Sequence, residues 1–313
     1  MVFPIGDDNS DRRTVPAVNY VLIALNVLVF VVFQGMGEND TFTYKYATVP
    51  KEIATGKDIV TNDRVIGVVL NGEARAYPIS VAEAHEAIHD TLGGVPILVA
   101  FSPLCDAAAV YDRRIGPRTV SFGWSGLVRN ANTLLYDRTE GNNTPSLWQQ
   151  IDGRAIAGPA AARGERLTPV GVVSIDTWGD WLAAHPDTTV IARNDEFVEL
   201  YKVISYDREL ASPSLPFAIA PMPPADSLPL KSRVLVLEAN GSRKVVALPS
   251  NPGTAHPPLT VEVGGATLRL TPGPVEGTCG IEVQEGEGLR VVPCCWFTAY
   301  ASLGCQAADV VRW

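Results

Sequence analysis

The sequence is poor in charged residues and in histidine, and it lacks the motifs of the common nucleotide-binding and serine-hydrolase sites. Charged residues make up 19% of the 313 residues, only 4 residues are His, and the net charge is −9. The longest basic runs are pairs such as Arg12-Arg13. Because nucleic-acid-binding proteins carry a basic patch, we expect no nucleic-acid partner. The chain also has no P-loop, no GxGxxG and no GxSxG, so none of the sites that these motifs build is predicted.

Cysteine is equally scarce, and its spacing excludes a redox motif of the CxxC type. There are 5 cysteines, so at least one thiol has no partner for a disulfide within the chain. The adjacent Cys294 and Cys295 would point to opposite faces of a strand. This pattern does not predict a disulfide framework.

Long apolar runs are missing too, with one exception over residues 15–33. This run contains no charged residue, and as a helix it would rise about 28 Å, close to the roughly 30 Å hydrocarbon core of a bilayer. A core helix would show a polar stripe, and a cleaved signal peptide would have a shorter apolar region followed by a small-residue cleavage site. A membrane anchor fits better than either alternative.

The charges around this run predict its orientation. Arg12-Arg13 lie just before it, and no Lys or Arg follows until Lys45. The positive-inside rule therefore places residues 1–14 in the cytoplasm and the rest of the protein outside it. Membrane lipid around residues 15–33 is the one partner that the sequence predicts, and no protein partner is predicted.

After a connector over residues 34–62, the pattern predicts a β-rich α+β soluble body. Short apolar runs alternate with turn residues, and the chain contains 27 Gly and 24 Pro, which favours short strands. Asn71-Gly72 predicts a tight hairpin. A helix from Ser80 through Asp90 and a buried strand over residues 95–101 are expected to follow.

The hairpin pattern occurs twice, which suggests an internal duplication. Arg64, Asn71-Gly72 and Arg75 recur at a constant offset as the set Arg233, Asn240-Gly241 and Lys244. A proline-rich stretch over residues 221–231 separates a first part, residues 63–220, from a second part, residues 231–313. We predict two diverged repeats, and two unrelated hairpins are the alternative.

Several segments in order resemble a known family. They are DRVIGVVLNGEARAYPI, AHEAIHDTLGGVPILVAFSPLCDAA, SFGWSGL and TWGDWLAAHPDTTV, and together they are similar to domain-of-unknown-function family 3179 over about residues 63–313. The resemblance implies a fold and a candidate site but no activity.

The start of the chain resembles a different family. Residues 1–60 are similar to the first membrane span of bacterial rhomboid proteases, which need further spans and a GxSG serine inside the membrane. Here Ser125 lies in a GxSG that predicts a strand, and no second membrane-length run exists. We therefore expect no active rhomboid protease.

The sharpest chemical motif is an HExxH over residues 85–89. On a helix, His85 and His89 would share a face and bind zinc, while Glu86 would activate a water as the catalytic residue. No third ligand follows at a known spacing. The family pattern is WHExxND, which makes His89 a replacement for asparagine. Hydrogen-bonded structural histidines are the alternative.

A second candidate lies in Ser102-Pro-Leu-Cys105, where the resemblance implies the pattern C-P-L-C-G. Only Cys105 of the two cysteines is present, so a dithiol mechanism lacks one thiol. If the strand and the preceding helix are neighbours, His85, His89 and Cys105 could bind zinc or copper. A buried inert thiol is the alternative. The sequence thus predicts a membrane-anchored extracytoplasmic module of unsettled activity, or else a metal- or thiol-dependent enzyme that uses His85, Glu86 and Cys105.

Overall fold

A computed structural model describes residues 53–54, 59–138, 144–191, 194–251 and 256–313. All of them belong to one compact unit that begins at Pro50. The predicted tail over residues 1–14 and the predicted anchor over residues 15–33 lie outside the described residues. Within the part of the chain that is described, no helix is both long enough and apolar enough to cross a membrane.

A five-stranded sheet organises the first part. Its order is β1 (Ile53–Ala54), β15 (Thr189–Ile191), β3 (Glu73–Pro78), β2 (Arg64–Leu70) and β14 (Val172–Thr177). The β2–β3 hairpin turns at Asn71 and Gly72, whose φ angles of 50° and 82° are those of a type I′ turn. The predicted hairpin is confirmed. Helix α5 (Trp178–Ala184) leads from β14 to β15, which pairs with β3 in parallel.

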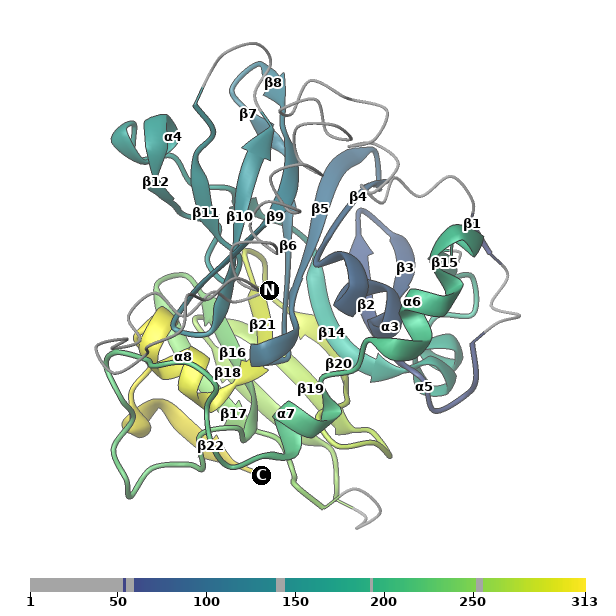
Figure 1. The fold of residues 1–313 in the computed structure, drawn as a ribbon. Coiled ribbons are helices and arrows are strands. Elements are labelled where there is room, and N and C mark those ends of the chain that lie inside the picture. The colour runs from purple at the N-terminus through teal and green to yellow at the C-terminus, as the bar shows by residue number, and fades with distance from the viewer. Residues whose placement is uncertain (1–52, 55–58, 139–143, 192–193, 252–255) are drawn as a thin grey trace, which may run out of the picture. The chain divides into compact units, whose positions relative to one another are not determined.

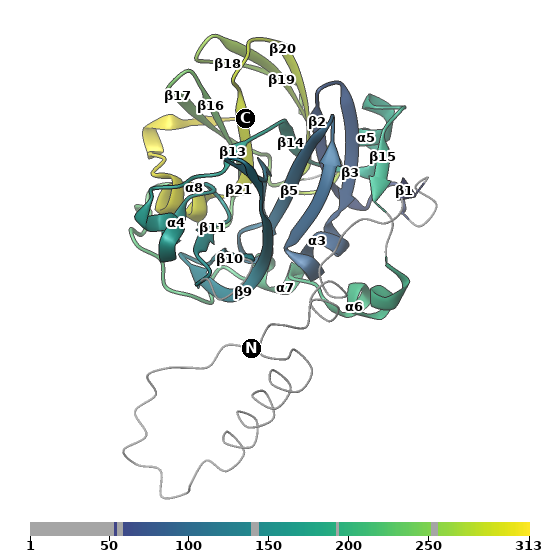
Figure 2. The same cartoon turned by 90° about the horizontal axis from the view of Figure 1, so that it is seen from above.

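The second part contains a sheet with the same connectivity. Its order is β21 (Arg290–Cys295), β16 (Arg233–Ala239), β17 (Ser242–Ala247) and β22 (Val310–Arg312). The β16–β17 turn also has positive φ, 48° at Asn240 and 76° at Gly241. Helix α8 (Trp296–Leu303) leads from β21 to β22, which pairs with β17 in parallel. Figure 2 shows this sheet and α8 on one side of the unit, with β2, β3 and α5 on the other.

In each part, an asparagine side chain at the turn of the first hairpin forms a hydrogen bond with the turn of the next hairpin. The two hairpins are β4 (Ala87–Leu92) with β5 (Val95–Ser102), and β18 (Leu259–Val263) with β19 (Ala266–Pro272). The side-chain amide of Asn71 donates to the carbonyl of Gly93 at 2.8 Å, and that of Asn240 donates to the carbonyl of Gly264 at 2.7 Å. Both glycines have positive φ and touch the backbone of the preceding turn, so a side chain there would clash.

Both hairpins continue into a third strand. β6 (Ala107–Asp112) pairs with β5, and β20 (Cys279–Glu285) pairs with β19. In the first part, β13 (Thr168–Pro169) extends the sheet on the far side of β6. Figure 1 shows β6 beside β21 and β20 beside β14, so each part lies against a strand of the other.

The first part also carries a separate four-stranded sheet that has no counterpart among the described residues of the second part. Its order is β12 (Ala155–Ala157), β11 (Leu147–Gln149), β10 (Asn132–Arg138) and β9 (Ser121–Arg129). The remaining elements of this region are β7 (Arg114–Ile115), β8 (Arg118–Thr119) and α4 (Gly158–Ala162). The body is β-rich, as predicted.

The predicted helix from Ser80 through Asp90 is wrong at its C-terminal end. Helix α3 (Ile79–His85) stops because Glu86 adopts a left-handed conformation with φ 55°. The next six residues form β4, whose backbone pairs with β5. Hydrogen bonds to a neighbouring strand thus outweigh the local helical pattern, which carries only a weak preference. The other helices are η2 (Pro103–Cys105), η3 (Asp195–Phe197), α6 (Val198–Val203), α7 (Asp207–Ala211) and η4 (Ala307–Asp309).

One apolar core joins the two parts. Cys105 and Ile151 from the first part are buried together with Val236, Cys294 and Trp296 from the second. A second cluster lies wholly within the first part, around α3, β2 and β5. Because burial of apolar area drives folding, the shared core fixes how the ends of β2, η2 and β16 face each other.

Candidate functional site

A buried carboxylate lies where the two parts meet. Asp106 ends η2 in a left-handed conformation, with φ 46°, and its side chain is 1% exposed. Its Oδ2 accepts hydrogen bonds at 2.6 Å from Arg64 Nη2 and at 2.6 Å from Arg233 Nε. Arg64 begins β2 and Arg233 begins β16, so the two arginines hold the same position in the two matching sheets.

The charges at this bridge are unequal. Burial alone would raise the pKa of Asp106, but the positive charges and hydrogen bonds of Arg64 and Arg233 outweigh burial, so the pKa is lowered. Two guanidinium groups face one carboxylate, and the second oxygen of Asp106 has no hydrogen-bond partner among the described residues. The three bridge residues therefore carry a net charge of +1, and the carboxylates of Glu83 and Glu276 act on the arginines from nearby.

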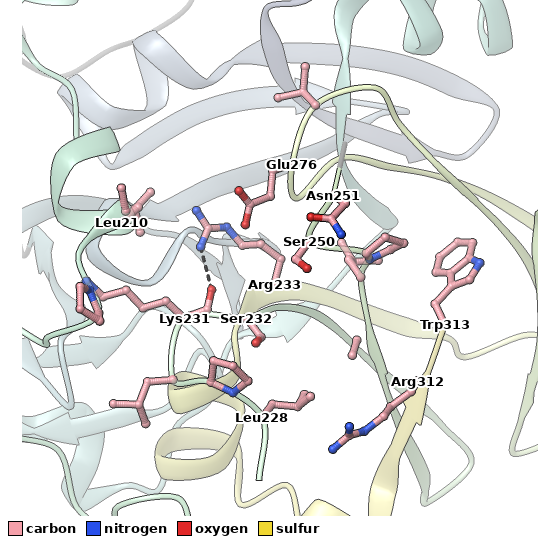
Figure 3. A pocket seen from close by; sticks show the side chains of 18 of the residues that line it. Leu210, Leu228, Lys231, Ser232, Arg233, Ser250, Asn251, Glu276, Arg312 and Trp313 are labelled. Carbon is pink, nitrogen blue, oxygen red and sulfur yellow. Dashed lines mark hydrogen bonds between the residues drawn. The ribbon is translucent and has the colours of Figure 1, made fainter. Parts of the chain in front are cut away.

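The same two arginines line a pocket of about 890 Å³. Figure 3 shows Arg233 between Lys231 and Glu276, with Leu210 and Leu228 on one side and Trp313 on the other. The charged residues that line the pocket are Arg64, Lys231, Arg233, Arg312, Asp207 and Glu276. Basic groups therefore outnumber acidic ones here, although the whole chain carries a net charge of −9.

A second polar network lies just behind the bridge and contains two of the predicted site residues. Thr133 Oγ1 donates to Glu86 Oε2 at 2.6 Å, and the backbone N–H of Thr133 donates to Ser102 Oγ at 3.1 Å. The side-chain amide of Asn132 lies 3.9 Å from the sulfur of Cys105, which donates to the carbonyl of Ala131 at 3.2 Å. Glu86 and Cys105 thus belong to one buried network.

The two histidines lie elsewhere. His85 Nε2 is 2.9 Å from the hydroxyl of Tyr201, and burial lowers the pKa of His85 to about 4. His89 lies on β4, where its Nε2 accepts from the backbone N–H of Phe122 at 2.9 Å. Burial and then the charges of two arginines lower the pKa of His89 to about 3. Both histidines are therefore neutral at pH 7, and no hydrogen bond between described residues joins either one to Glu86 or Cys105.

The structure thus does not assemble the predicted metal ligands. Because α3 ends at His85, the HExxH runs from a helix into a strand, and its two histidines do not share a helical face. In the described ranges, no three His, Cys, Asp or Glu side chains are grouped so that they could hold a metal ion. The proposed set of His85, His89 and Cys105 is dispersed, because the helix on which it depended is too short.

Glu86 and Cys105 differ in whether they ionise near pH 7. Burial raises the pKa of Cys105 to about 11, so this group is a thiol at pH 7 and a weak nucleophile. Burial also raises the pKa of Glu86 to about 7, against a smaller lowering by the hydrogen bond from Thr133. Glu86 is therefore the only one of the predicted site residues that changes charge near neutral pH.

No local sequence pattern pointed to Asp106, Thr133 or the roles of the two arginines. Arg64 and Arg233 were visible as the repeated first residue of the two hairpins, but the repeat alone gave no reason to join them. The bridging carboxylate lies far from both along the chain, 42 residues from Arg64 and 127 from Arg233. Only the packing of the two parts brings the three together.

Comparison with known proteins identifies one family. A family model with the description "Protein of unknown function (DUF3179)" matches residues 46–292. No curated protein and no solved structure matches the chain. The resemblance proposed from the ordered segments is thus confirmed, whereas the likeness of residues 1–60 to a rhomboid protease gains no support.

The bridge predicts a large and specific stability loss. Asp106→Asn leaves two largely buried arginines, 16% and 13% exposed, without their counter-charge, so the free energy of unfolding should fall by about 3–5 kcal/mol at pH 7. Since the folded-state pKa of Asp106 is lowered, this contribution is present above the ordinary pKa and disappears as the pH falls through the folded-state value. Urea unfolding of both proteins measures it.

Asp112→Asn is the matched control for this measurement. Asp112 pairs with Arg114, whose side chain is 52% exposed, and surface pairs contribute about 1 kcal/mol or less. Equal losses in the two variants would show that the buried bridge has no special weight.

The network around Glu86 predicts that the free energy of unfolding depends on pH with the sign opposite to that of the Asp106 bridge. Because the pKa of Glu86 is raised to about 7 in the folded protein, the buried carboxylate destabilises the fold once it ionises. Glu86→Gln should therefore be more stable than the wild type above pH 7, by up to about 3 kcal/mol. The gain should shrink as the pH falls towards 4.5, the ordinary value for Glu.

Urea unfolding at several pH values between 4 and 8 tests this, with Glu282→Gln on the exposed face of β20 as the control. A constant difference between wild type and Glu86→Gln across that range would contradict the assignment.

Proposed function

Because the chain belongs to the DUF3179 family, whose description assigns no activity, we propose its function from the site alone: the body is a binding module that holds a small anion in the pocket between its two parts. The observation that carries the proposal is the convergence of Arg64, Lys231, Arg233 and Arg312 on one pocket of a chain that is acidic overall. A concave surface on which charge of one sign predominates concentrates ligands of the opposite sign, and here four basic residues stand against Asp207 and Glu276.

The pocket has the size and the mixed lining of a small-molecule site. Its volume of about 890 Å³ falls within the range of roughly 300–1,000 Å³ that ligand pockets occupy. Polar groups from Ser232, Ser250 and Asn251 lie among apolar side chains (Figure 3). Such a lining offers hydrogen bonds that orient a ligand and apolar surface that increases its affinity.

We also infer that the body arose by duplication. Three features that the two parts share support this. They are the strand order, the β–α–β connections after β14 and β21, and the hydrogen bonds from asparagine side chains to the carbonyls of Gly93 and Gly264. Two unrelated hairpins would not be expected to share all three features. In this view Arg64 and Arg233 are copies of one residue, and the pocket lies where the two copies meet.

The alternative, a metal- or thiol-dependent enzyme that uses His85, Glu86 and Cys105, has less support. The thiol of Cys105 is fully buried, and His85 contacts Tyr201 instead of Glu86 or Cys105. Of these three residues, only Glu86 has a pKa suited to proton transfer near pH 7. Ser125 on β9 donates to the carbonyl of Leu134 at 2.5 Å, which gives no support to a rhomboid-like nucleophile.

Anion binding is tested by calorimetry on the full-length chain, kept in a non-ionic detergent, with acetate, hexanoate, succinate and inorganic phosphate as probes. We expect at least one anion to bind with one-to-one stoichiometry, and the exposed Arg312→Gln to weaken it about 2–5-fold, the effect of one partly screened charge. Arg269→Gln, at an exposed position on β19, should leave binding unchanged. If hexylamine binds as well as the anions do, or if no anion binds at all, the proposal is wrong.

We further propose that residues 15–33 anchor this module to a membrane with the body on the extracytoplasmic side, on the strength of the uncharged apolar run and the preceding arginines. The full-length chain should then remain in the membrane fraction after alkaline extraction, with Trp313 accessible to protease from outside. A fragment that begins at Pro50 should be released and should still unfold cooperatively, since it contains the whole compact unit. Alkaline release of the full-length chain would refute the anchor.

A further inference from the structure

The arginine bridge leaves hydrogen-bond donors facing the pocket. Arg233 uses Nε for Asp106 and Nη1 for the carbonyl of Lys231, at 2.6 Å and 3.0 Å. Its Nη2 has no hydrogen-bond acceptor among the described residues. Lys231 Nζ donates to the carbonyl of Glu209 and has two further protons. Arg233 and Lys231, which both line the pocket, therefore keep N–H groups available for a ligand, although Figure 3 shows the Lys231 side chain extending away from Arg233.

The charge count around these donors favours a ligand with a single negative charge. Four cations line the pocket. Against them stand Asp207 and Glu276 in the lining and Asp106 behind the arginines. The pocket lining and Asp106 together carry one net positive charge. Glu83, which interacts with Arg64 and whose pKa is raised by burial to about 7, reduces this charge as it ionises, so a monoanion suits the pocket better than a phosphate dianion. The planar fork of a guanidinium also matches the planar carboxylate group.

The rest of the pocket is too large and too apolar for an acid group alone. Leucine side chains at 210, 228, 230 and 248 line it together with Val275 and Trp313. Leu228 is half-buried and packs against the shared core. An alkyl or aryl group bound along this wall would remove apolar surface from water, at about 0.8 kcal/mol for each buried CH₂.

From these three features we infer that the ligand is a monocarboxylate with an apolar stem. Its carboxylate binds Arg233 and Lys231 beside the Asp106 bridge, and its stem lies along Leu228 and the neighbouring leucines. The inference rests on the proposed anion-binding function and adds the chemical class of the ligand and its orientation in the pocket.

Calorimetry on the full-length chain in non-ionic detergent tests the class with four probes: acetate, hexanoate, 1-hexanol and inorganic phosphate. Hexanoate should bind at least 10-fold more tightly than acetate, because it adds four CH₂ groups, and at least 10-fold more tightly than phosphate. Hexanol, which has the stem without the acid, should bind more weakly than hexanoate by a similar factor.

Two variants test the orientation. Leu228→Asn should weaken hexanoate several-fold and leave acetate unchanged, whereas Lys231→Gln should weaken both acids and leave hexanol unchanged. Arg269→Gln is again the control. Both substitutions are at positions that are only half-buried, and a urea unfolding curve for each confirms that it folds.

The outcomes separate the two proposals. Tighter binding of phosphate than of hexanoate, or equal binding of hexanol and hexanoate, would overturn the monocarboxylate and leave the anion pocket standing. Binding of none of these three anions would overturn the monocarboxylate, and if succinate does not bind either, the anion pocket is overturned as well. Weakening of hexanoate by Arg269→Gln as much as by Lys231→Gln would place the acid group outside this pocket and overturn the inference.

Discussion

The bridge from Arg64 through Asp106 to Arg233 is the interaction on which the arrangement of the two parts depends. A carboxylate as deeply buried as Asp106 is stable only when it is paired, and removing it leaves two largely buried guanidinium groups without their counter-ion. The carboxylate comes from the turn after η2, and the guanidinium groups come from the first residues of two separate sheets. The bridge therefore holds three segments in one relative position, and the shared apolar core around Cys105 and Trp296 packs on the same junction.

The position of the bridge also explains why the pocket is where it is. Arg64 and Arg233 have one face towards Asp106 and line the pocket with the other. A carboxylate inside the fold thus holds the arginines in place at the pocket wall. For the anion that we propose, donors preorganised in this way would lower the entropy cost of binding. The Glu86 network lies on the buried side of the same junction, where Thr133 and Ser102 connect it to the segment that carries Asp106. The proposed binding site and Glu86 therefore lie on neighbouring parts of one structure.

The elements that could be predicted from the sequence are those with a local signal. The Asn71-Gly72 and Asn240-Gly241 turns were predictable because a type I′ hairpin needs positive φ at both residues, and asparagine and glycine tolerate it. The β-rich class followed from turn residues between short apolar runs. The failure at residues 86–90 has the opposite origin. AIHDTL has no strong local preference, and its pairing with β5 decides that it is a strand. Once the helix is shortened, the predicted grouping of His85 with His89 no longer holds.

The sequence alone determined the family and the two similar hairpins. It also showed that charged residues are scarce, which makes a cluster of arginines unusual. It also named Glu86 and Cys105 as site residues, and these do share a buried network. Only the tertiary structure decided which residues meet at the junction. Arg64, Asp106 and Arg233 are distant along the chain, and neither the pairing of charges nor the burial that shifts a pKa has a signature in short-range sequence. Both arise only when strands from the two parts pack together and exclude water.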